Sequence, residues 1–517
     1  MPAKFPNLPC KEFEIKCHTD FTQHDLEKLI RKQLRIGNFT YEIVKQSLDA
    51  RHKPNVHWLL QLRVFSKELK TGTLRGEPTL EITYRKRNKK VVVVGSGPAG
   101  FFAAYTLQLA GFNVILIEKG RRVNDRFGDI QEFEKGGDFK NNANYCHGEG
   151  GAGTFSDGKL TSRTKGIAPE KQWVFENYVK AGAPEEILYL AKPHIGSDNL
   201  RRVIPNLRNH FENAGGEIWF ETEVTGLEMF DKKCKGIFST KGSVECDYLI
   251  VAPGHSSYQT YRMLNRHGIR FRIKPFAIGV RVEHSQQLIN LSQWGASALP
   301  GLKAAEYKLT YTATNGLPVY SFCMCPGGRV VPSAPENRQN IVNGVSDYAR
   351  NSPFANSAIV AGTDIQAVLK KEVSLEEALQ WMEDLERKVF DLSGSYDVPG
   401  IVIHDFIENR ASTIIPSNSF PFRVFPFTFE GLLPPETMVA LREGMVDFKK
   451  KIKGFETGIM LGLESKTSSP VQVVRDEHRR CDSFENIFIV GEGSGYAGGI
   501  TSSAVDGVKA AMEIINR

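Results

Sequence analysis

Apolar and polar positions along the chain show their clearest order between residues 91 and 120. The four consecutive valines Val91–Val94 form a short apolar run, which is typical of a buried strand. A helical pattern follows, with Leu107 and Leu109 near its end, and a second apolar run covers Val114–Ile117. Strand, helix and strand in this succession predict a βαβ unit, whose two strands lie parallel in one sheet.

The pattern over residues 11–84 indicates a small α+β module ahead of this unit. Phe13, Ile15 and Cys17 alternate with polar residues as in a strand, and Leu26–Leu34 follow at helical spacing. Further strands are predicted over residues 41–48, 56–65 and 80–84. Elements in this order favour a ferredoxin-like arrangement, and a basic linker over residues 85–90 joins it to the first valine strand.

Downstream of residue 120, strand and helix patterns recur in two places, on either side of a region with a less regular pattern. A helix is predicted over residues 198–214, with Pro205 inside it, and strands over residues 218–224 and 244–251. From residue 276 to about 433, short β-like runs at 277–282 and 319–323 mix with irregular passages and one clear helix. Ser374 caps that helix, with Glu377 as its capping-box partner. A strand over 487–490 and a helix over 502–515 close the chain.

These patterns predict an α/β protein with a Rossmann-like dinucleotide-binding domain, an inserted α+β substrate domain and a small N-terminal ferredoxin-like α+β module. The expected parts are residues 1–88 for the basic module, 89–275 and 434–517 for the two pieces of the nucleotide-binding domain, and 276–433 for the inserted cap. A run of phenylalanines in the cap is consistent with core packing or with an apolar substrate wall: Phe420, Phe422, Phe425, Phe427 and Phe429.

Charge is distributed unevenly. Residues 1–90 contain 19 Lys and Arg against 10 Asp and Glu, a net charge of +9, whereas the rest of the chain carries −2. Basic patches attract nucleic-acid backbones, but the aromatic residues of this module are too scattered to define a stacking platform. A solvated surface, a protein-docking surface and nucleic-acid binding therefore stay open as alternatives for the module.

The composition indicates a cytoplasmic protein. No apolar run approaches the roughly 18 residues that a membrane span needs, and the N-terminus lacks the apolar core of a signal peptide. The eight cysteines are scattered, except for the close pair Cys323 and Cys325, and no second pair lies nearby to complete a four-thiolate metal site. We therefore predict reduced thiols and no bound metal.

The chemistry of the βαβ unit lies in its turn, Gly95-Ser96-Gly97-Pro98-Ala99-Gly100. In a GxGxxG turn between strand and helix, the first glycine permits the sharp turn and the second lets the backbone approach a pyrophosphate. The third glycine lets the helix pack closely, and the helix N-terminus attracts the phosphates. Glu118 lies 23 positions past Gly95, where an acid accepts hydrogen bonds from an adenosine ribose. The alternative is a strand–helix turn without a ligand.

Two further glycine-rich stretches favour ligand contact. Five glycines lie between Gly148 and Gly158, where backbone N–H groups can form an anion nest or bind the edge of a flat ligand. A flexible surface loop is the alternative. The second stretch, Gly491–Gly499, opens the last helix and presents another N-terminus to a ligand. The turn Ala252–Gly254 follows a strand, at the sheet end where α/β proteins bind ligands.

Taken together, these segments resemble FAD-dependent oxidoreductases of the glutathione-reductase type that lack a separate NADPH domain. The chain is most similar to a family of largely uncharacterised FAD-dependent dehydrogenases. The motifs that carry this resemblance are SLDAR at 47–51, GEGGAGTFSDGKLT at 148–161, ESKTSSP at 464–470 and GEGSGYAGGITSSAVDG at 491–507. The resemblance implies FAD as the cofactor. It leaves the substrate open.

The resemblance also assigns FAD contacts by position. Gly95, Gly97 and Gly100 would hold the pyrophosphate, Glu118 the ribose, and the Val224 backbone the adenine side. Gly491 and Glu492 would lie at the ribityl chain and the pyrophosphate, and Gly499, Ile500 and Thr501 would face the isoalloxazine. The remaining expected contacts are Pro98, Ala99, Lys119, Gly150, Gly151, Gly153, Ser156, Ala252 and Gly254. Many relatives have Asp at the position of Glu492.

The function implied is an oxidoreductase that exchanges hydride or electrons between FAD and an organic substrate beneath the cap. Acid–base candidates are His147, Glu464 and Tyr496, each with a structural role as its alternative, and Cys146 is a candidate redox partner of a flavin. No second GxGxxG follows a strand in the way that an NADPH domain of the disulfide-reductase kind needs, and the CxxxxC redox pair of that kind is missing. NAD(P)H stays open as a transient electron donor. Two other hypotheses are a flavin-dependent RNA-modifying enzyme and a non-catalytic FAD-bound scaffold. The oligomeric state is not predicted.

Overall fold

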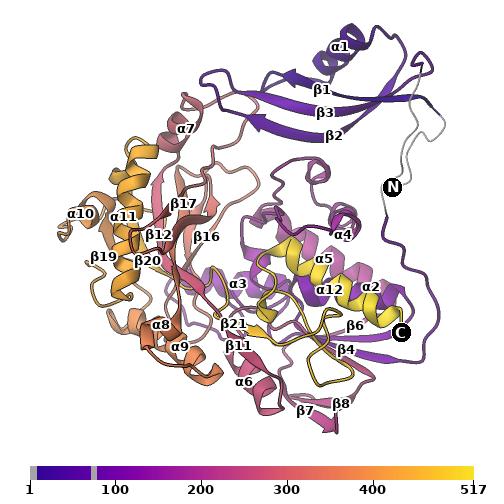
Figure 1. The fold of residues 1–517 in the computed structure, drawn as a ribbon, viewed down its shortest axis with the longest axis vertical. Coiled ribbons are helices and arrows are strands. Elements are labelled where there is room, and N and C mark those ends of the chain that lie inside the picture. The colour runs from indigo at the N-terminus through magenta and orange to yellow at the C-terminus, as the bar shows by residue number, and fades with distance from the viewer. Residues whose placement is uncertain (1–7, 71–78) are drawn as a thin grey trace.

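The computed structural model describes residues 8–70 and 79–517, and these residues form three parts (Figure 1). The first part is a parallel sheet of five strands in the order β22-β10-β4-β5-β6. Its strands are β4 (Lys90–Val94), β5 (Asn113–Ile117), β6 (Glu217–Trp219), β10 (Tyr248–Val251) and β22 (Ile487–Ile489). All neighbours pair in parallel. This is the strand order of a Rossmann sheet, so the predicted fold class is confirmed.

Helices cover one face of this sheet. They are α2 (Pro98–Leu109), α4 (Ala168–Lys180), α5 (Ser197–Asn213) and α12 (Ile500–Ile515), and their apolar side chains share one core with β4 and β5. Helices α2 and α12 approach closely, since a Cβ at Gly507 would lie 2.0 Å from the Ala99 carbonyl oxygen. Pro205 lies inside α5, as the sequence predicts.

The opposite face packs against a small antiparallel sheet. Its strands are β7 (Val224–Phe230), β8 (Lys233–Ser239) and β9 (Gly242–Glu245), with helix α6 (Tyr258–Arg266) beside them. Helix α3 (Val123–Glu134) follows β5 and leads into the glycine-rich stretch at 148–158. The strands β11 (Phe271–Ile273) and β21 (Val471–Val473) pair at the junction with the cap.

The second part, the cap, is built on a sheet of seven strands in the order β13-β14-β17-β12-β20-β18-β19. The strands are β12 (Phe276–Ser285), β13 (Thr310–Thr312), β14 (Pro318–Cys325), β17 (Phe354–Thr363), β18 (Val398–Val402), β19 (Val424–Pro426) and β20 (Ile459–Glu464). A hairpin of β15 (Arg329–Pro332) and β16 (Val342–Val345) lies beside it. Because β20 belongs to this sheet, the cap extends beyond the expected boundary at residue 433.

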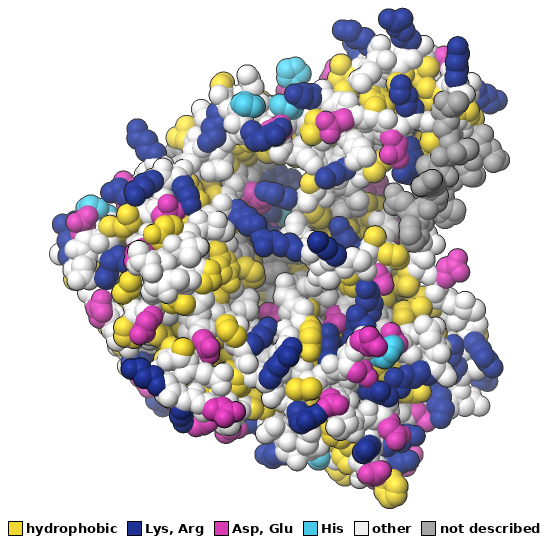
Figure 2. Space-filling view, in the orientation of Figure 1, with side chains coloured by type: hydrophobic (Ala, Val, Ile, Leu, Met, Phe, Trp, Pro, Cys, Tyr) yellow, Lys and Arg dark blue, Asp and Glu magenta, His cyan; other side chains and the backbone are white. Residues whose placement is uncertain are grey.

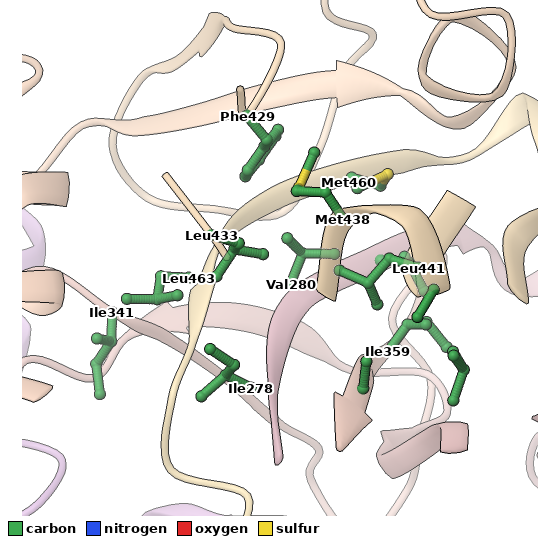
Figure 3. Close-up of a cluster of buried hydrophobic side chains, with 14 of the residues drawn as sticks. Ile278, Val280, Ile341, Ile359, Phe429, Leu433, Met438, Leu441, Met460 and Leu463 are labelled. Carbon is green, nitrogen blue, oxygen red and sulfur yellow. The ribbon is translucent and has the colours of Figure 1, made fainter. Parts of the chain in front are cut away.

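The cap core lies between this sheet and its helices. The helices are α7 (Gln286–Trp294), α8 (Ile365–Leu369), α9 (Leu375–Asp391), α10 (Ile403–Ile407) and α11 (Pro435–Lys451). Figure 3 shows Val280 and Ile359 of the sheet with Leu441 of α11 and Met460 of β20 in one apolar cluster. The predicted capping box of Ser374 and Glu377 at the start of α9 is confirmed. Phe420 and Phe429 are buried, which supports core packing for that phenylalanine run.

The third part is the N-terminal module, which lies at the top of Figure 1. Strands β1 (Cys10–Cys17), β2 (Thr40–Asp49) and β3 (His57–Phe65) form an antiparallel sheet in the order β1-β3-β2, covered by helix α1 (Gln23–Leu34). These elements match one half of a ferredoxin-like arrangement, and the complete arrangement stays a prediction.

The prediction of a strand over residues 80–84 is wrong. Residues 79–89 form no strand, and Leu80 and Ile82 pack instead against the helical core of the nucleotide-binding part. The backbone N–H groups of Arg85 and Arg87 donate to the carbonyls of Ala110 and Gly111 at the end of α2. The alternating pattern at 80–84 therefore reflects an extended segment that lies along the neighbouring domain.

Candidate functional site

Two glycines of the 95–100 turn are required by close packing. Gly95 has φ +96°, and a Cβ at this position would lie 2.3 Å from the Ala252 carbonyl oxygen. A Cβ at Gly100 would lie 1.8 Å from the carbonyl oxygen of Gly95. No side chain fits at either position, so these glycines press the start of α2 against the ends of β4 and β10.

Gly97 differs from both, because the protein leaves room around it. Its φ is −64°, and the nearest atom to a Cβ at this position would be the Cα of Gly151, at 3.8 Å. Gly97 is the N-cap of α2, and no side chain caps that helix. Backbone N–H groups of the first helical turn are thus left for an outside partner, and the space over Gly97 admits an anion against the positive end of the helix dipole.

The Glu118 carboxylate closes the other side of this turn. It is buried, and one of its oxygens accepts hydrogen bonds from the Ser96 N–H at 2.8 Å and the Ser96 hydroxyl at 2.7 Å. The other oxygen accepts from the Gly120 N–H at 2.8 Å. A carboxylate oxygen can accept two hydrogen bonds, so Glu118 is held in place while the oxygen bonded to Gly120 keeps capacity for a hydroxyl group. Next to it, Lys119 lies 3.7 Å from Glu223 and 3.4 Å from Glu336.

A buried arginine that the sequence did not single out shapes the second glycine stretch. Arg126, on α3, is fully buried and donates to the carbonyls of Asn144 (2.7 Å), Tyr145 (3.0 Å), Glu149 (3.0 Å) and Gly151 (2.8 Å). Burial lowers the pKa of Arg126 to about 10, so the side chain stays charged at neutral pH. One guanidinium therefore fixes the backbone that faces Gly97. Arg126 lies in a polar stretch without periodicity, so the sequence gave no indication of this role.

The glycine stretches converge on one place. Pro98, at the start of α2, lies close to Gly151 and Gly153, and Ile500 lies 3.3 Å from where a Cβ of Gly153 would be. A Cβ at Gly491 would lie 2.6 Å from the Ala99 side chain. We call residues 95–100, 148–153, 252–254 and 491–501 the glycine cradle. Helix α12, like α2, begins behind a glycine N-cap, Gly499, without a side-chain cap.

The other predicted contacts surround this cradle. Ser156 donates to the Gly153 carbonyl at 2.8 Å, and Thr501 donates to the Leu160 carbonyl at 2.8 Å. Gly150 and Gly254 adopt positive φ angles of 76° and 73°. Val224 begins β7, two residues after Thr222, whose N–H donates to the Glu118 carbonyl.

Several buried polar atoms at the cradle have no hydrogen-bond partner among the described residues. They are the two ring nitrogens of His255 and the Nε2 atom of His147. His255 Nδ1 lies 3.7 Å from the Glu492 carboxylate. Buried polar atoms are normally paired, so this group indicates a polar ligand that completes the site.

The three acid–base candidates lie in different surroundings. Burial lowers the pKa of His147 to about 3, which keeps its imidazole neutral. Burial raises the pKa of Glu464 to about 7, although Arg281 lies 3.1 Å away and opposes this shift. Tyr496 is 44% exposed, and its ring lies 4.0 Å below the Arg475 guanidinium. Burial raises the pKa of the Cys146 thiol, which disfavours a reactive thiolate there.

Arg281 is the centre of a buried polar group in the cap, which we call the arginine cluster. It is fully buried on β12 and donates to the side chains of Glu464 (3.1 Å), Asn356 (2.7 Å) and Asn343 (3.0 Å). It also donates to the Cys323 carbonyl at 3.3 Å. A charged residue in the apolar run FAIGVRV was the sequence signal that could have revealed this cluster.

A second charged group joins the 148–161 stretch to the cap. Buried Asp157 accepts from Arg350 at 2.9 Å and pairs with Lys159 at 2.8 Å.

Figure 2 shows the surface hollowed between the N-terminal module, the cap and the nucleotide-binding part, with Lys and Arg side chains around the hollow. No helix in the described parts of the chain is both long and apolar enough to cross a membrane.

Family models cover most of the chain. The model for the pyridine nucleotide-disulphide oxidoreductases matches residues 89–291, and the model for the FAD-dependent protein, C-terminal domain-like family matches residues 275–467. A domain of unknown function matches residues 10–65. An uncharacterised protein of Clostridium beijerinckii is 38% identical over 518 residues, which cover 95% of this chain and 96% of that protein.

Solved flavoprotein structures are also similar, at low sequence identity. Glycine oxidase from Bacillus cereus is 11% identical, with 83% of this chain and 95% of that chain covered and a TM-score of 0.37. The flavin-dependent brominase Bmp2 is 14% identical, with coverage of 83% and 79% and a TM-score of 0.39. The two FAD-related family models, together with the full-length relative, show that the chain belongs to the FAD-dependent oxidoreductase family.

Proposed function

We propose that this protein transfers hydride or electrons between FAD and an organic substrate that binds beneath the cap. The observation that carries the proposal is the space over Gly97, bounded by Gly151 and by the uncapped start of α2. Backbone N–H groups at an open helix N-terminus suit a pyrophosphate, and Glu118 beside them suits the ribose.

The residues present fit FAD. The unpaired ring nitrogens of His255 and the unpaired Nε2 of His147 lie buried at the cradle, where a polar ligand would supply the missing partners. Gly97, Ala99 and Gly100 would hold the pyrophosphate, and Val224 would contact the adenine side. Gly491 and Glu492 would hold the ribityl chain, and Gly499, Ile500 and Thr501 would face the ring. Bound FAD supplies reversible hydride acceptance at N5.

The protein's own groups would orient the reaction and move protons. The uncapped start of α12 presents a positive dipole end, which stabilises negative charge at its terminus. His147 is neutral and serves as a hydrogen-bonding group at the cradle. Glu464 is the acid–base candidate, because its pKa of about 7 suits proton exchange at neutral pH.

The matching family models support neither an RNA-modifying enzyme nor a non-catalytic scaffold.

NAD(P)H is the electron donor to test first. The test is an anaerobic absorbance titration of the purified protein with NADPH and then NADH. We expect the yellow oxidised chromophore to bleach with one of them. A yellow protein that neither donor bleaches would overturn the pyridine-nucleotide step, and a protein that stays colourless after incubation with FAD would contradict the proposal as a whole.

A further inference from the structure

The cysteines of the motif Cys323-Met324-Cys325 lie at the end of β14, in an irregular part of the cap sheet. Phe322 pairs with Ala358 and Cys325 pairs with Asn356, so β14 carries one more residue here than β17. This is a β-bulge, which bends the strand and re-aims its side chains. Cys323 has φ +45°, a left-handed conformation that is uncommon for a residue with a side chain.

The bulge turns the Cys325 thiol back onto Cys323. The Cys325 thiol donates to the Cys323 carbonyl at 3.3 Å, so its sulfur lies against the residue that it would join. Cys323 is half-buried and Cys325 is fully buried. A reagent from solution therefore meets Cys323 first, and Cys325 lies behind it.

Two cations lie beside this pair. The Lys159 ammonium is 4.0 Å from the Cys325 sulfur, and the Arg281 guanidinium donates to the Cys323 carbonyl at 3.3 Å. The neighbouring Cys325 thiol lowers the pKa of the Cys323 thiol, both cations lower it further, and burial and Asp157 oppose the shift. Because Cys323 is the more accessible thiol of the pair, it is the attacking one and Cys325 the resolving one.

We propose that Cys323 and Cys325 form a reversible dithiol–disulfide pair, a redox site in addition to the FAD cradle. The Cys323 thiolate attacks one sulfur of a small disulfide such as oxidised glutathione, forms a mixed disulfide and releases one glutathione thiolate. The Cys325 thiolate then attacks the Cys323 sulfur, closes the intramolecular disulfide and releases the second glutathione. The pair loses two electrons and two protons, which the two glutathione thiols gain.

Cys234 and Cys246 provide an internal comparison. Cys234 lies on β8 and Cys246 directly follows β9, both are buried, and neither has a positive φ. The Cys234 thiol donates to the Gly236 carbonyl at 3.1 Å. Neither thiol is open to solvent in the way that Cys323 is. Cys323 and Cys325 differ from them in access, in the nearby cations and in the bulge.

The test measures thiols in the full-length, FAD-loaded protein. Samples equilibrated in graded ratios of oxidised to reduced glutathione are quenched in acid, alkylated and digested with trypsin. Both cysteines fall in one peptide, residues 309–329, which separates them from the other six. We expect this peptide to lose two hydrogen atoms and escape alkylation under oxidising conditions, and to recover with dithiothreitol. The protein would lose two of its eight free thiols.

Serine variants give the matched controls. Cys323→Ser and Cys325→Ser should each abolish the loss of the thiol pair, whereas Cys234→Ser should leave it unchanged. Full alkylation of peptide 309–329 at every ratio would overturn the proposal. A stable glutathione adduct on Cys323 without ring closure would overturn it as well. The decisive measurement uses the wild-type protein, so its outcome stands even if a serine variant misfolds.

Discussion

The glycine cradle and the arginine cluster hold polar chemistry in opposite ways. In the cradle, polar groups come from the backbone, and the space over Gly97 exists because side chains are missing. In the arginine cluster, Arg281 and Glu464 are 183 positions apart and meet only when β12 and β20 pair. Local glycine spacing therefore marks each segment of the cradle in the sequence, whereas the cluster becomes visible only when the strands pair. The cradle is therefore sensitive to added atoms, and the arginine cluster is sensitive to the loss of a charge.

The largest effect should come from removing the central cation of the cluster. Arg281→Met would leave the buried Glu464 carboxyl and the side chains of Asn343 and Asn356 without their donor. Breaking a buried ion pair costs about 3–5 kcal/mol of unfolding free energy. Urea denaturation of both proteins measures this loss. A change under 1 kcal/mol would show that the cluster contributes little to cap stability.

Within the cradle, two glycines three positions apart should respond differently. Gly100→Ala places a methyl group 1.8 Å from the Gly95 carbonyl oxygen, and such overpacking costs about 1–3 kcal/mol or more. Gly97→Ala meets no atom closer than 3.8 Å and keeps an allowed φ of −64°, so the stability of the FAD-free protein should stay within about 0.5 kcal/mol of wild type. Equal losses in thermal unfolding would contradict this division.

The pH dependence of stability tests the cluster more finely. The folded protein holds a proton on Glu464 up to a pKa of about 7, above the usual 4.5, so its stabilising effect is complete below pH 4.5 and disappears as pH rises through 7. Wild type should therefore lose stability relative to Glu464→Gln over this interval, by at most about 1.4 kcal/mol per pH unit. Parallel curves for the two proteins would show that the carboxyl titrates normally.

The smallest effect should come from a cap element that local sequence does specify. Ser374 accepts from the Glu377 N–H, and Glu377 accepts from the Ser374 N–H, which begins α9. Ser374→Ala should lower the unfolding free energy by about 1 kcal/mol. The control Ser297→Ala alters an exposed serine of the cap outside any helix. If both variants unfold at the same urea concentration, the capping box adds nothing to the cap.

The sequence predicted the elements whose contacts are short in range. The βαβ unit, the Ser374 capping box and the return of the chain to the parallel sheet at residue 487 all follow from local patterns. It did not predict Arg126, whose four carbonyl acceptors lie 18 to 25 positions away in a stretch without periodicity. The cap boundary was missed because β20 joins β12 across the chain, and no local pattern reports that pairing.

The contact of the cysteines was missed for a related reason. Their spacing is visible in the sequence, but the bulge that turns the Cys325 thiol back onto Cys323 depends on how β14 pairs with β17. Lys159 approaches from the 148–161 stretch, which is separated from the pair by more than 150 residues. Spacing alone excluded a four-thiolate metal site and left the pair without a role.

The most direct test of the central claim is an equilibrium titration of FAD-free wild type and Gly97→Ala with FAD, followed by flavin absorbance or fluorescence. A methyl group in the space over Gly97 should displace the pyrophosphate from the backbone, at a cost of about 1–3 kcal/mol, or an about 5- to 150-fold weaker Kd. The folded state of the variant, checked by circular dichroism, should be unchanged. Equal affinity in the two proteins would place the pyrophosphate elsewhere and contradict the cradle.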